Sequence, residues 1–482
     1  MKMLELLKPQ KVFYYFEELT KIPHGSGNTK EISDYCVQFA KEHQITYYQD
    51  AYNNVILVKE ATKGRENDAG VIIQGHLDMV AVKDAESTHD FTKDALPLAI
   101  KGDWVSSTNT SLGGDDGIAV AYALAILSDN TISHPHLEVI LTVDEEVGME
   151  GATQIDLSMI KGKYLLNLDS EEEGVLLTSC AGGLTGKITL PVQYADAEGI
   201  SYTILIEGLA GGHSGAEIHK ERANSIKLAG RLLHVLKESV NMGVVAFYGG
   251  EKDNAIPRSC AIEVLVAEED SSMLEEILAQ EELSYKNEYI VSDSNLSIRA
   301  CKNGKKEAKV LVPTVQEKLI FLLVNLPNGV QNWSMDIHGL VETSLNIGIA
   351  RLEKEEAIFT ISVRSSVKSR KYALSAQIKY LAEFLGGEYQ VNGDYPEWEY
   401  KRDSNLRELA FRVYQEMFGK KPEIQAIHAG LECGILLEKC PWLDIISFGP
   451  DMKDIHTPKE MLSISSTQRM WEYLITLLMK IS

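Results

Sequence analysis

Three apolar runs of β-forming residues in this sequence each end in acidic or histidine side chains. The side chains that follow residues 71–74, 136–143 and 163–168 are, in that order, His76 with Asp78, Glu145 with Glu146, and Asp169. In open α/β sheets the active site lies at the carboxyl ends of the strands. Adjacent acids at the end of a buried strand repel one another unless a cation lies between them. The sequence therefore predicts an α/β domain with a cation-binding edge.

Two of the candidate positions have ordinary alternatives. Residues two apart on a strand point to the same side, so the Asp78 carboxylate could hold the His76 ring and fix its tautomer. Such a pair also occurs without a metal. Asp115 and Asp116 follow two glycines and precede an alanine-rich helix, where one acid would serve as a helix cap. Two glycines before two acids are more than a cap requires.

Taken together, the candidates are sufficient for two metal ions. They are His76, Asp78, Asp115, Glu145, Glu146, Asp169 and His456. Two metals about 3.5–4 Å apart need a shared carboxylate, one histidine each and one further carboxylate each, with a spare carboxylate to move a proton. Imidazole with carboxylate suits Zn²⁺ best, with Mn²⁺ or Co²⁺ possible, whereas Ca²⁺ and Mg²⁺ would not require histidine. We therefore expect two Zn²⁺ per chain.

The composition excludes several classes of protein. With 482 residues, 44% of them hydrophobic, the chain is long enough for two or more domains. Its formal charge of −23 disfavours nonspecific binding to nucleic acid or an anionic membrane. The six cysteines show no Cys-x-x-Cys pattern, which fits reduced thiols better than disulfides. We expect a soluble cytoplasmic protein without nucleic-acid or membrane partners.

The pattern of predicted strands and helices changes near residue 186. Residues 187–396 contain strand–helix–strand patterns about twice over, including helices predicted at 224–236 and 373–384. We expect an inserted α+β domain there, formed of duplicated ferredoxin-like units. Residues 1–186 and 397–482 would together form a three-layer αβα domain with a mixed central sheet.

The order of these motifs resembles the co-catalytic di-zinc peptidases, a family that includes aminoacylase, carboxypeptidase G and tripeptidase T. The resemblance covers essentially the whole chain and includes Leu-Gly-Gly-Asp-Asp-Gly, Asp-Glu-Glu-Val-Gly-Met-Glu, Gly-His-Ser-Gly, Ile-His-Ala-Gly-Leu-Glu-Cys-Gly and His-Thr-Pro-Lys-Glu. It implies the following roles: His76 and Asp169 on one metal, Glu146 and His456 on the other, Asp115 bridging, Glu145 as general base, and Asp78 orienting His76. Sequence alone does not exclude Asp116 or Glu150 as ligands.

The resemblance also implies substrate contacts. His213 would stabilise the oxyanion, Arg364 and Asn254 would bind the substrate's terminal carboxylate or backbone, and Glu432 and Gly430 would receive its amine or shape the pocket. A loop histidine and a surface salt bridge are the alternatives for His213 and Arg364. The insert would act as a lid and form a homodimer, with His213 acting in cis or in trans.

The resemblance is compatible with three functions. The first is hydrolysis of dipeptides with broad specificity, including Xaa-His substrates such as β-alanyl-histidine. The second is a related activity of the same fold, either on N-acyl amino acids or on tripeptides. The third is a peptide-binding protein without catalysis, which predicts the loss of a ligand or of the base, and none is missing.

Overall fold

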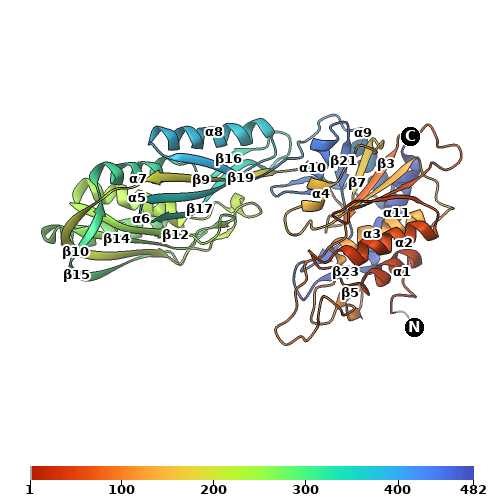
Figure 1. Cartoon of the computed structure of the whole chain (residues 1–482), viewed down its shortest axis with the longest axis horizontal. Helices are drawn as coiled ribbons and strands as arrows, with labels where there is room; N and C mark the ends of the chain where they lie inside the picture. Colours follow the sequence, from red (N-terminus) through yellow and green to blue (C-terminus); the bar gives the residue numbers. More distant parts are fainter. Residues whose placement is uncertain (1–2) are drawn as a thin grey trace. The chain divides into compact units, whose positions relative to one another are not determined.

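The computed structural model describes residues 3–482 and divides into two compact units (Figure 1). Unit 1 comprises Met1–Ser179, Tyr400–Ala426 and Leu431–Ser482, and unit 2 comprises Cys180–Glu399 and Ile427–Gly430. Unit 2 is thus inserted into the chain of unit 1. The boundaries expected from sequence, 186/187 and 396/397, differ from these by seven and three residues, and the role of unit 2 as a lid stays a prediction.

The centre of unit 1 is an eight-stranded mixed sheet with the order β1-β2-β6-β3-β7-β21-β8-β20. Its strands are β1 (Thr46–Gln49), β2 (Val55–Lys59), β6 (Leu137–Thr142), β3 (Val71–His76), β7 (Tyr164–Asn167), β21 (Asp444–Ser447), β8 (Val175–Cys180) and β20 (Glu423–Ile427). β3 is parallel to β6 and β7, and β7 is parallel to β21. The β1–β2, β2–β6 and β21–β8 pairs are antiparallel. The carboxyl ends of β3, β6 and β7 therefore meet at one edge of the sheet.

Helices and a small sheet complete unit 1. They are α1 (Gln10–Leu19), α2 (Lys30–Glu42), α3 (Gly114–Leu127), α4 (Glu150–Gln154), α9 (Asn405–Phe418), α10 (Glu432–Lys439) and α11 (Ile464–Lys480), with a sheet in the order β22 (Met452–Lys453), β23 (Met461–Ser463), β5 (Trp104–Ser107), β4 (Leu98–Lys101). α3 packs against α1 and β3, and every residue of α3 is buried, which explains why its sequence is apolar on all sides. The predicted α/β class with a mixed central sheet is confirmed.

Unit 2 has its own hydrophobic core around a nine-stranded sheet. One half follows the order β10 (Tyr194–Glu207), α5 (Ser225–Ser239), β12 (Met242–Gly249), β14 (Cys260–Val266), α6 (Ser271–Glu288), β15 (Ser297–Leu311). The other follows β9 (Gly182–Pro191), α7 (Pro313–Asn325), β17 (Val341–Leu352), β18 (Glu356–Ser365), α8 (Lys368–Phe384), β19 (Glu388–Tyr395), with β16 (Gly329–Trp333) beside β17.

Each half has the β-α-β-β-α-β order of a ferredoxin-like unit. The sheet order is β15-β10-β14-β12 in the first half and β17-β18-β9-β19 in the second, and the halves join where β12 pairs with β17. α8 lies along the second half, against β9, β18 and β19 (Figure 1). The remaining elements of unit 2 are a two-stranded sheet, β11 (Gly212–His213) with β13 (Ala255–Ile256), and the short 3₁₀ helices η1 (Ile218–Lys220) and η2 (Glu268–Asp270). Among residues 3–482, no helix combines the length and the apolarity needed to cross a membrane.

Candidate metal centre

His76 is the last residue of β3, and its side chain is only 1% exposed. Its Nδ1 lies 2.9 Å from the main-chain oxygen of Asp78. Because a carbonyl oxygen can only accept, Nδ1 carries a proton and Nε2 is the ring atom that faces other groups. The Asp78 carboxylate, expected from sequence to hold this ring, lies farther away, with Oδ1 3.6 Å from Nδ1. The orientation of His76 is therefore fixed mainly by the main chain of Asp78.

The Asp78 carboxylate instead holds the turn that follows β6. Oδ1 accepts a hydrogen bond from the amide of Glu145 at 3.1 Å, and Oδ2 accepts one from the hydroxyl of Ser26 at 2.8 Å. The amide of Glu146 also donates to Oδ2, at 3.4 Å. Asp78 thereby links the end of β3 to the acids that follow β6.

Asp115 lies between the two histidines. Its Oδ1 is 3.2 Å from Nε2 of His76, and its Oδ2 is 3.1 Å from Nε2 of His456. The histidines are 380 residues apart in the sequence, so only the fold brings them to one carboxylate. A carboxylate with one oxygen toward each of two imidazoles has the arrangement required to bridge two metals.

His456 and Glu146 form the second part of the centre. Glu146 Oε1 lies 2.8 Å from Nε2 of His456. Asp115, Glu146 and His456 each offer one ligand atom, and these atoms lie within 4.8 Å of one another. The same holds for His76, Glu145 and Glu146. The side chain of His456 is 44% exposed, so this part of the centre is open to a small molecule.

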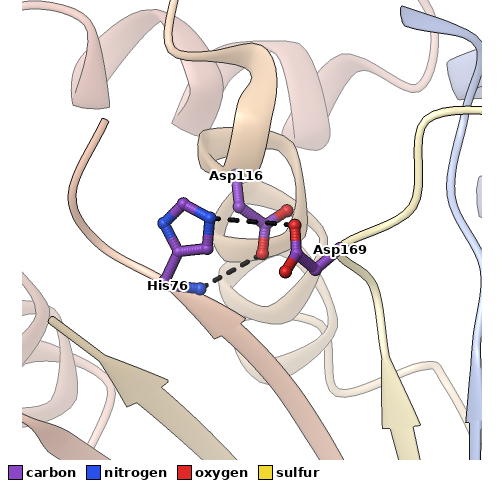
Figure 2. A group of neighbouring side chains, drawn as sticks. All are labelled: His76, Asp116 and Asp169. Atoms are coloured by element: carbon purple, nitrogen blue, oxygen red, sulfur yellow. Dashed lines mark hydrogen bonds and ion pairs between the residues drawn. The ribbon is translucent and has the colours of Figure 1, made fainter. Parts of the chain in front are cut away.

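Asp169 and Asp116 also lie beside His76 (Figure 2). Asp169 Oδ1 lies 3.7 Å from Nε2 of His76, and Asp116 Oδ2 accepts a hydrogen bond from the His76 amide at 3.1 Å. Ligand atoms of these three residues also lie within 4.8 Å of one another. Geometry therefore keeps Asp116 beside Asp169 as an alternative ligand, although one of its oxygens is already bonded to the main chain.

The pKa values in this cluster show how strongly burial and neighbouring negative charges oppose ionisation of its carboxyl groups. Burial raises the pKa of Glu145 to about 8 and that of Asp169 to about 7, and neighbouring carboxylates add to both shifts. Burial opposes ionisation of Asp115, but hydrogen bonds from His456 and His76 hold its pKa well below the usual value. Hydrogen bonds to Asp115 and Glu146 raise the pKa of His456 to about 10. The cluster attracts positive charge.

The residues present fit two divalent cations. The donor atoms are imidazole nitrogens and carboxylate oxygens, a set that divalent metals such as Zn²⁺ accept. Asp116 Oδ1 is also buried without a hydrogen-bond partner among the described residues, which a nearby cation would relieve. A cluster of buried carboxylates around two imidazoles is costly without added positive charge.

In unit 2, His213 and Arg364 flank Gly215. A Cβ atom at Gly215 would lie 3.1 Å from both His213 Cε1 and Arg364 Nε. His213 Nδ1 accepts hydrogen bonds from the amides of Gly215 and Ala216 at 3.1 and 3.0 Å, so the proton of the neutral ring is on Nε2. Burial and Arg364 lower the pKa of His213, which favours this neutral form.

Arg364 and Asn254 have different surroundings. Arg364 donates to the hydroxyl of Tyr395 at 2.8 Å, and its Nε is buried without a hydrogen-bond partner among the described residues. Asn254 lines a cavity of about 730 Å³ that also includes His213. The main-chain oxygen of Asn254 accepts from the amide of Ser214 at 2.9 Å. Unit 2 thus brings its three predicted substrate residues to the same region around the Gly-His-Ser-Gly segment.

Glu432 and Gly430 fall in different units. Gly430 belongs to unit 2, whereas Glu432 begins α10 in unit 1 and is 1% exposed. Glu432 Oε2 accepts from Gln74 Nε2 and Thr142 Oγ1, both at 2.6 Å. Burial raises the pKa of Glu432 to about 8. Its visible contacts are with strands β3 and β6, so its structural role is to join these strands to α10.

Comparison with known proteins gives the family. The family model described as "Peptidase family M20/M25/M40" matches residues 72–480. The chain belongs to peptidase family M20/M25/M40. The cytosol non-specific dipeptidase of Escherichia coli K12 is 36% identical over 483 residues, covering 100% of this chain and 99% of the relative. The family predicted from the motifs is therefore confirmed, and the chain is an enzyme of the peptidase class.

Solved structures agree with this family membership. The aminoacylhistidine dipeptidase of Vibrio alginolyticus superposes on this peptidase with a TM-score of 0.93 and 35% identity, covering 99% of this chain and 98% of that one. The aminopeptidase PepT of Bacillus cereus has a TM-score of 0.57 at 15% identity, covering 98% and 99%, which shows the shared fold alone. The alignment with the first structure covers 99% of the chain and therefore includes residues of both units.

The structure of this peptidase also reveals polar residues that the sequence did not single out. Gln74 donates to Glu432, and its own oxygen accepts from Asn167 at 2.6 Å, which links β3, β7 and α10 beneath the centre. Glu460 follows His456 by four residues and accepts hydrogen bonds from the loop that carries Asp115. A polar residue within a buried apolar run was the available signal for Gln74, and Glu460 ends the His-Thr-Pro-Lys-Glu motif, to which the sequence assigned no role beyond His456.

Proposed function

We propose that this peptidase is a zinc-dependent dipeptidase of broad specificity that accepts Xaa-His dipeptides such as β-alanyl-histidine. The observation that supports it most directly is the position of Asp115, whose two oxygens lie 3.2 and 3.1 Å from Nε2 of His76 and His456. The relatives that match nearly the full length are named as a cytosol non-specific dipeptidase and an aminoacylhistidine dipeptidase. The sequence motif and these names point to the same substrate class.

In this proposal, five side chains hold the two ions. His76 and Asp169 would bind one, Glu146 and His456 the other, and Asp115 both. Zn²⁺ suits this donor set, and Mn²⁺ or Co²⁺ could replace it. When bound, the ions would polarise the peptide carbonyl and lower the pKa of a water molecule toward neutrality.

Glu145 is the proposed general base. Its amide is held by Asp78, and its carboxylate offers an atom within 4.8 Å of ligand atoms of His76 and Glu146. This position, beside the metal ligands, is suited to taking a proton from the attacking water at a carboxylate oxygen and handing it to the leaving amine. Bound cations would favour the ionised carboxylate and so oppose the effect of burial, which raises the pKa of Glu145.

The residues of unit 2 would bind the substrate. His213, with its ring proton on Nε2, would donate a hydrogen bond to the oxyanion that forms during attack. Arg364, whose Nε has no partner among the described residues, would bind the substrate's terminal carboxylate, with Asn254 contacting its backbone. In this proposal unit 2 closes over the substrate as a lid and forms a homodimer, in the cytoplasm, and His213 acts in cis or in trans.

The proposal is tested with a panel of free dipeptides, tripeptides and N-acetyl amino acids. The purified protein should hydrolyse the dipeptides, lose activity on chelation and regain it when Zn²⁺ is returned. Glu145→Gln should keep its zinc and lower kcat by about 10²- to 10⁴-fold, because the proton can no longer be accepted.

A matched control is the exposed Glu150, which follows the same acidic segment. Glu150→Gln should leave turnover near the parent value. Hydrolysis of N-acetyl amino acids without hydrolysis of free dipeptides would refute the proposed substrate class. A Glu145→Gln variant with parental kcat would remove Glu145 from the mechanism.

A further inference from the structure

The carboxylate of Glu460 accepts hydrogen bonds from four consecutive main-chain amides. Oε2 accepts from Leu112 at 2.7 Å and Gly113 at 3.1 Å, and Oε1 accepts from Gly114 at 2.8 Å and Asp115 at 3.3 Å. The side chain is 3% exposed, so these amides take the place of water around it. Successive amides that converge in this way form an anion-binding concavity, and here the anion is part of the chain itself.

This contact fixes the loop that carries the bridging carboxylate. Gly113 has a positive φ of 67°, and the φ and ψ of Asp115, −82° and 105°, are not helical, so the helical conformation of α3 does not by itself set the loop. A Cβ atom at Gly114 would lie 3.2 Å from Glu460 Oε1, which shows how closely the carboxylate fills the turn. His456 lies four residues before Glu460, so one short segment supplies both a histidine of the centre and the acceptor for this loop.

We propose that Glu460 is a positioning residue for the metal pair, which holds the loop of residues 112–115 so that the oxygens of Asp115 point toward His76 and His456 together. The inference rests on the proposed function, because it concerns the same metal centre. Removing the acceptor would leave the amides free to turn and Asp115 free to engage one histidine without the other. The effect would fall on metal binding first and on hydrolysis as a consequence.

The test measures metal affinity rather than activity. Metal-free parent protein and the Glu460→Gln variant are titrated with Zn²⁺ against a competing chromophoric chelator, and with Co²⁺ followed by its visible absorption. In the variant, the amide NH₂ of Gln faces amides that need an acceptor. We expect affinity for at least one of the two ions to fall about ten- to a hundredfold, as for other residues that orient metal ligands, with a changed Co²⁺ spectrum.

Two further variants make the test specific. Gly114→Ala crowds Oε1 without removing the carboxylate and should lower the affinity in the same direction by a smaller factor. Lys459→Ala changes the exposed neighbouring side chain and should stay within about twofold of the parent, because this side chain lies outside the centre.

Circular dichroism of the metal-free proteins separates positioning from folding. Parental affinities and spectra in a folded Glu460→Gln variant would overturn the inference. A metal-free Glu460→Gln variant that does not fold would also overturn it, since the residue would then be structural. A folded parent that binds no Zn²⁺ would refute the proposed function, and with it the metal pair on which this inference depends.

Discussion

His428 is a buried histidine of unit 2 whose protonation should oppose folding. Its ring Nε2 lies 2.7 Å from the hydroxyl of Ser344, and burial, with a contribution from Arg364, lowers its pKa from 6.5 to about 3. Between these values the unfolded chain binds a proton that the folded chain does not. The stability that the neutral ring provides is therefore complete above pH 6.5 and is lost as the pH falls toward 3.

The different pKa of His428 in the folded and unfolded chains predicts a pH dependence of stability that a variant lacking this histidine should lose. Between pH 7 and pH 5 the parent should lose roughly 2 kcal/mol more unfolding free energy than His428→Gln, measured by urea unfolding. The exposed His234, replaced by Gln, should behave as the parent does. Equal losses in parent and His428→Gln would show that this ring takes up a proton equally readily in the folded and unfolded chains, and so would contradict the prediction.

At the same scale, the sequence indicated which acids and histidines would lie close together better than it indicated their contacts, and their roles as metal ligands stay a prediction. Acids and histidines at the ends of apolar runs could be found because strand ends are where such groups collect. The partner of the His76 ring could not, because the acceptor is the main-chain oxygen of Asp78, and main-chain oxygens have no sequence signal. Glu460 belongs to a motif that the sequence showed, but its role was missed because its partners lie about 345 residues earlier and are backbone amides.

Among the elements, the loop of residues 208–224 carries His213, and both ends of this loop are bonded to Asp293. Asp293, which is 3% exposed, accepts from the amide of Ala210 at 2.8 Å with Oδ1 and from that of Ala223 at 2.9 Å with Oδ2. One carboxylate therefore closes this loop. Burying such an acceptor is favourable only while both amides are bonded to it.

Asp293→Asn should loosen this loop because one of the two acceptors becomes a donor. We expect faster hydrogen exchange of the amides between residues 210 and 223 and a roughly tenfold or greater fall in kcat/KM, with zinc content unchanged, since misplacing a catalytic group by about 1 Å can cost up to 10²-fold. Ser292→Ala, which removes only a hydroxyl bonded to Oδ2, should have a smaller effect. Parental exchange rates in Asp293→Asn would contradict the role of this carboxylate.

The ends of two helices show how far the sequence pattern could predict helix boundaries. The helix predicted at 224–236 is α5, Ser225–Ser239, with Asn224 as its N-cap. The helix predicted at 373–384 is α8, which begins earlier, at Lys368. The sequence pattern missed its first turn because the residues there are mostly polar and show no apolar periodicity. One of them, Lys371, is fully buried, with Nζ 2.9 Å from Asp394 and 3.0 Å from Glu397. A buried lysine paired in this way depends on tertiary structure, which local patterns do not report.

For the whole molecule, the insertion of unit 2 is explained by the position of its ends. The main chains of Cys180 and Trp398 form an isolated antiparallel β-bridge. Strand β9 pairs with β19, with Gly183 opposite Tyr395. The chain therefore enters and leaves unit 2 through adjacent strands, and the unit has a hydrophobic core of its own. A domain whose ends lie side by side can be inserted into another without separating the elements of its host.

This arrangement predicts that residues 180–399 fold when produced alone. The fragment keeps its nine-stranded sheet and core, and loses only the short segment Ile427–Gly430, including the contact of His428 with Ser344. We expect a cooperative thermal transition and a far-ultraviolet spectrum of mixed helix and strand. Because His76, Asp115 and His456 belong to unit 1, the fragment should bind no Zn²⁺ in the titration used for the full chain. An unfolded fragment would show that the core of unit 2 is insufficient by itself, and stoichiometric zinc binding by a folded fragment would place a metal site outside the cluster around Asp115.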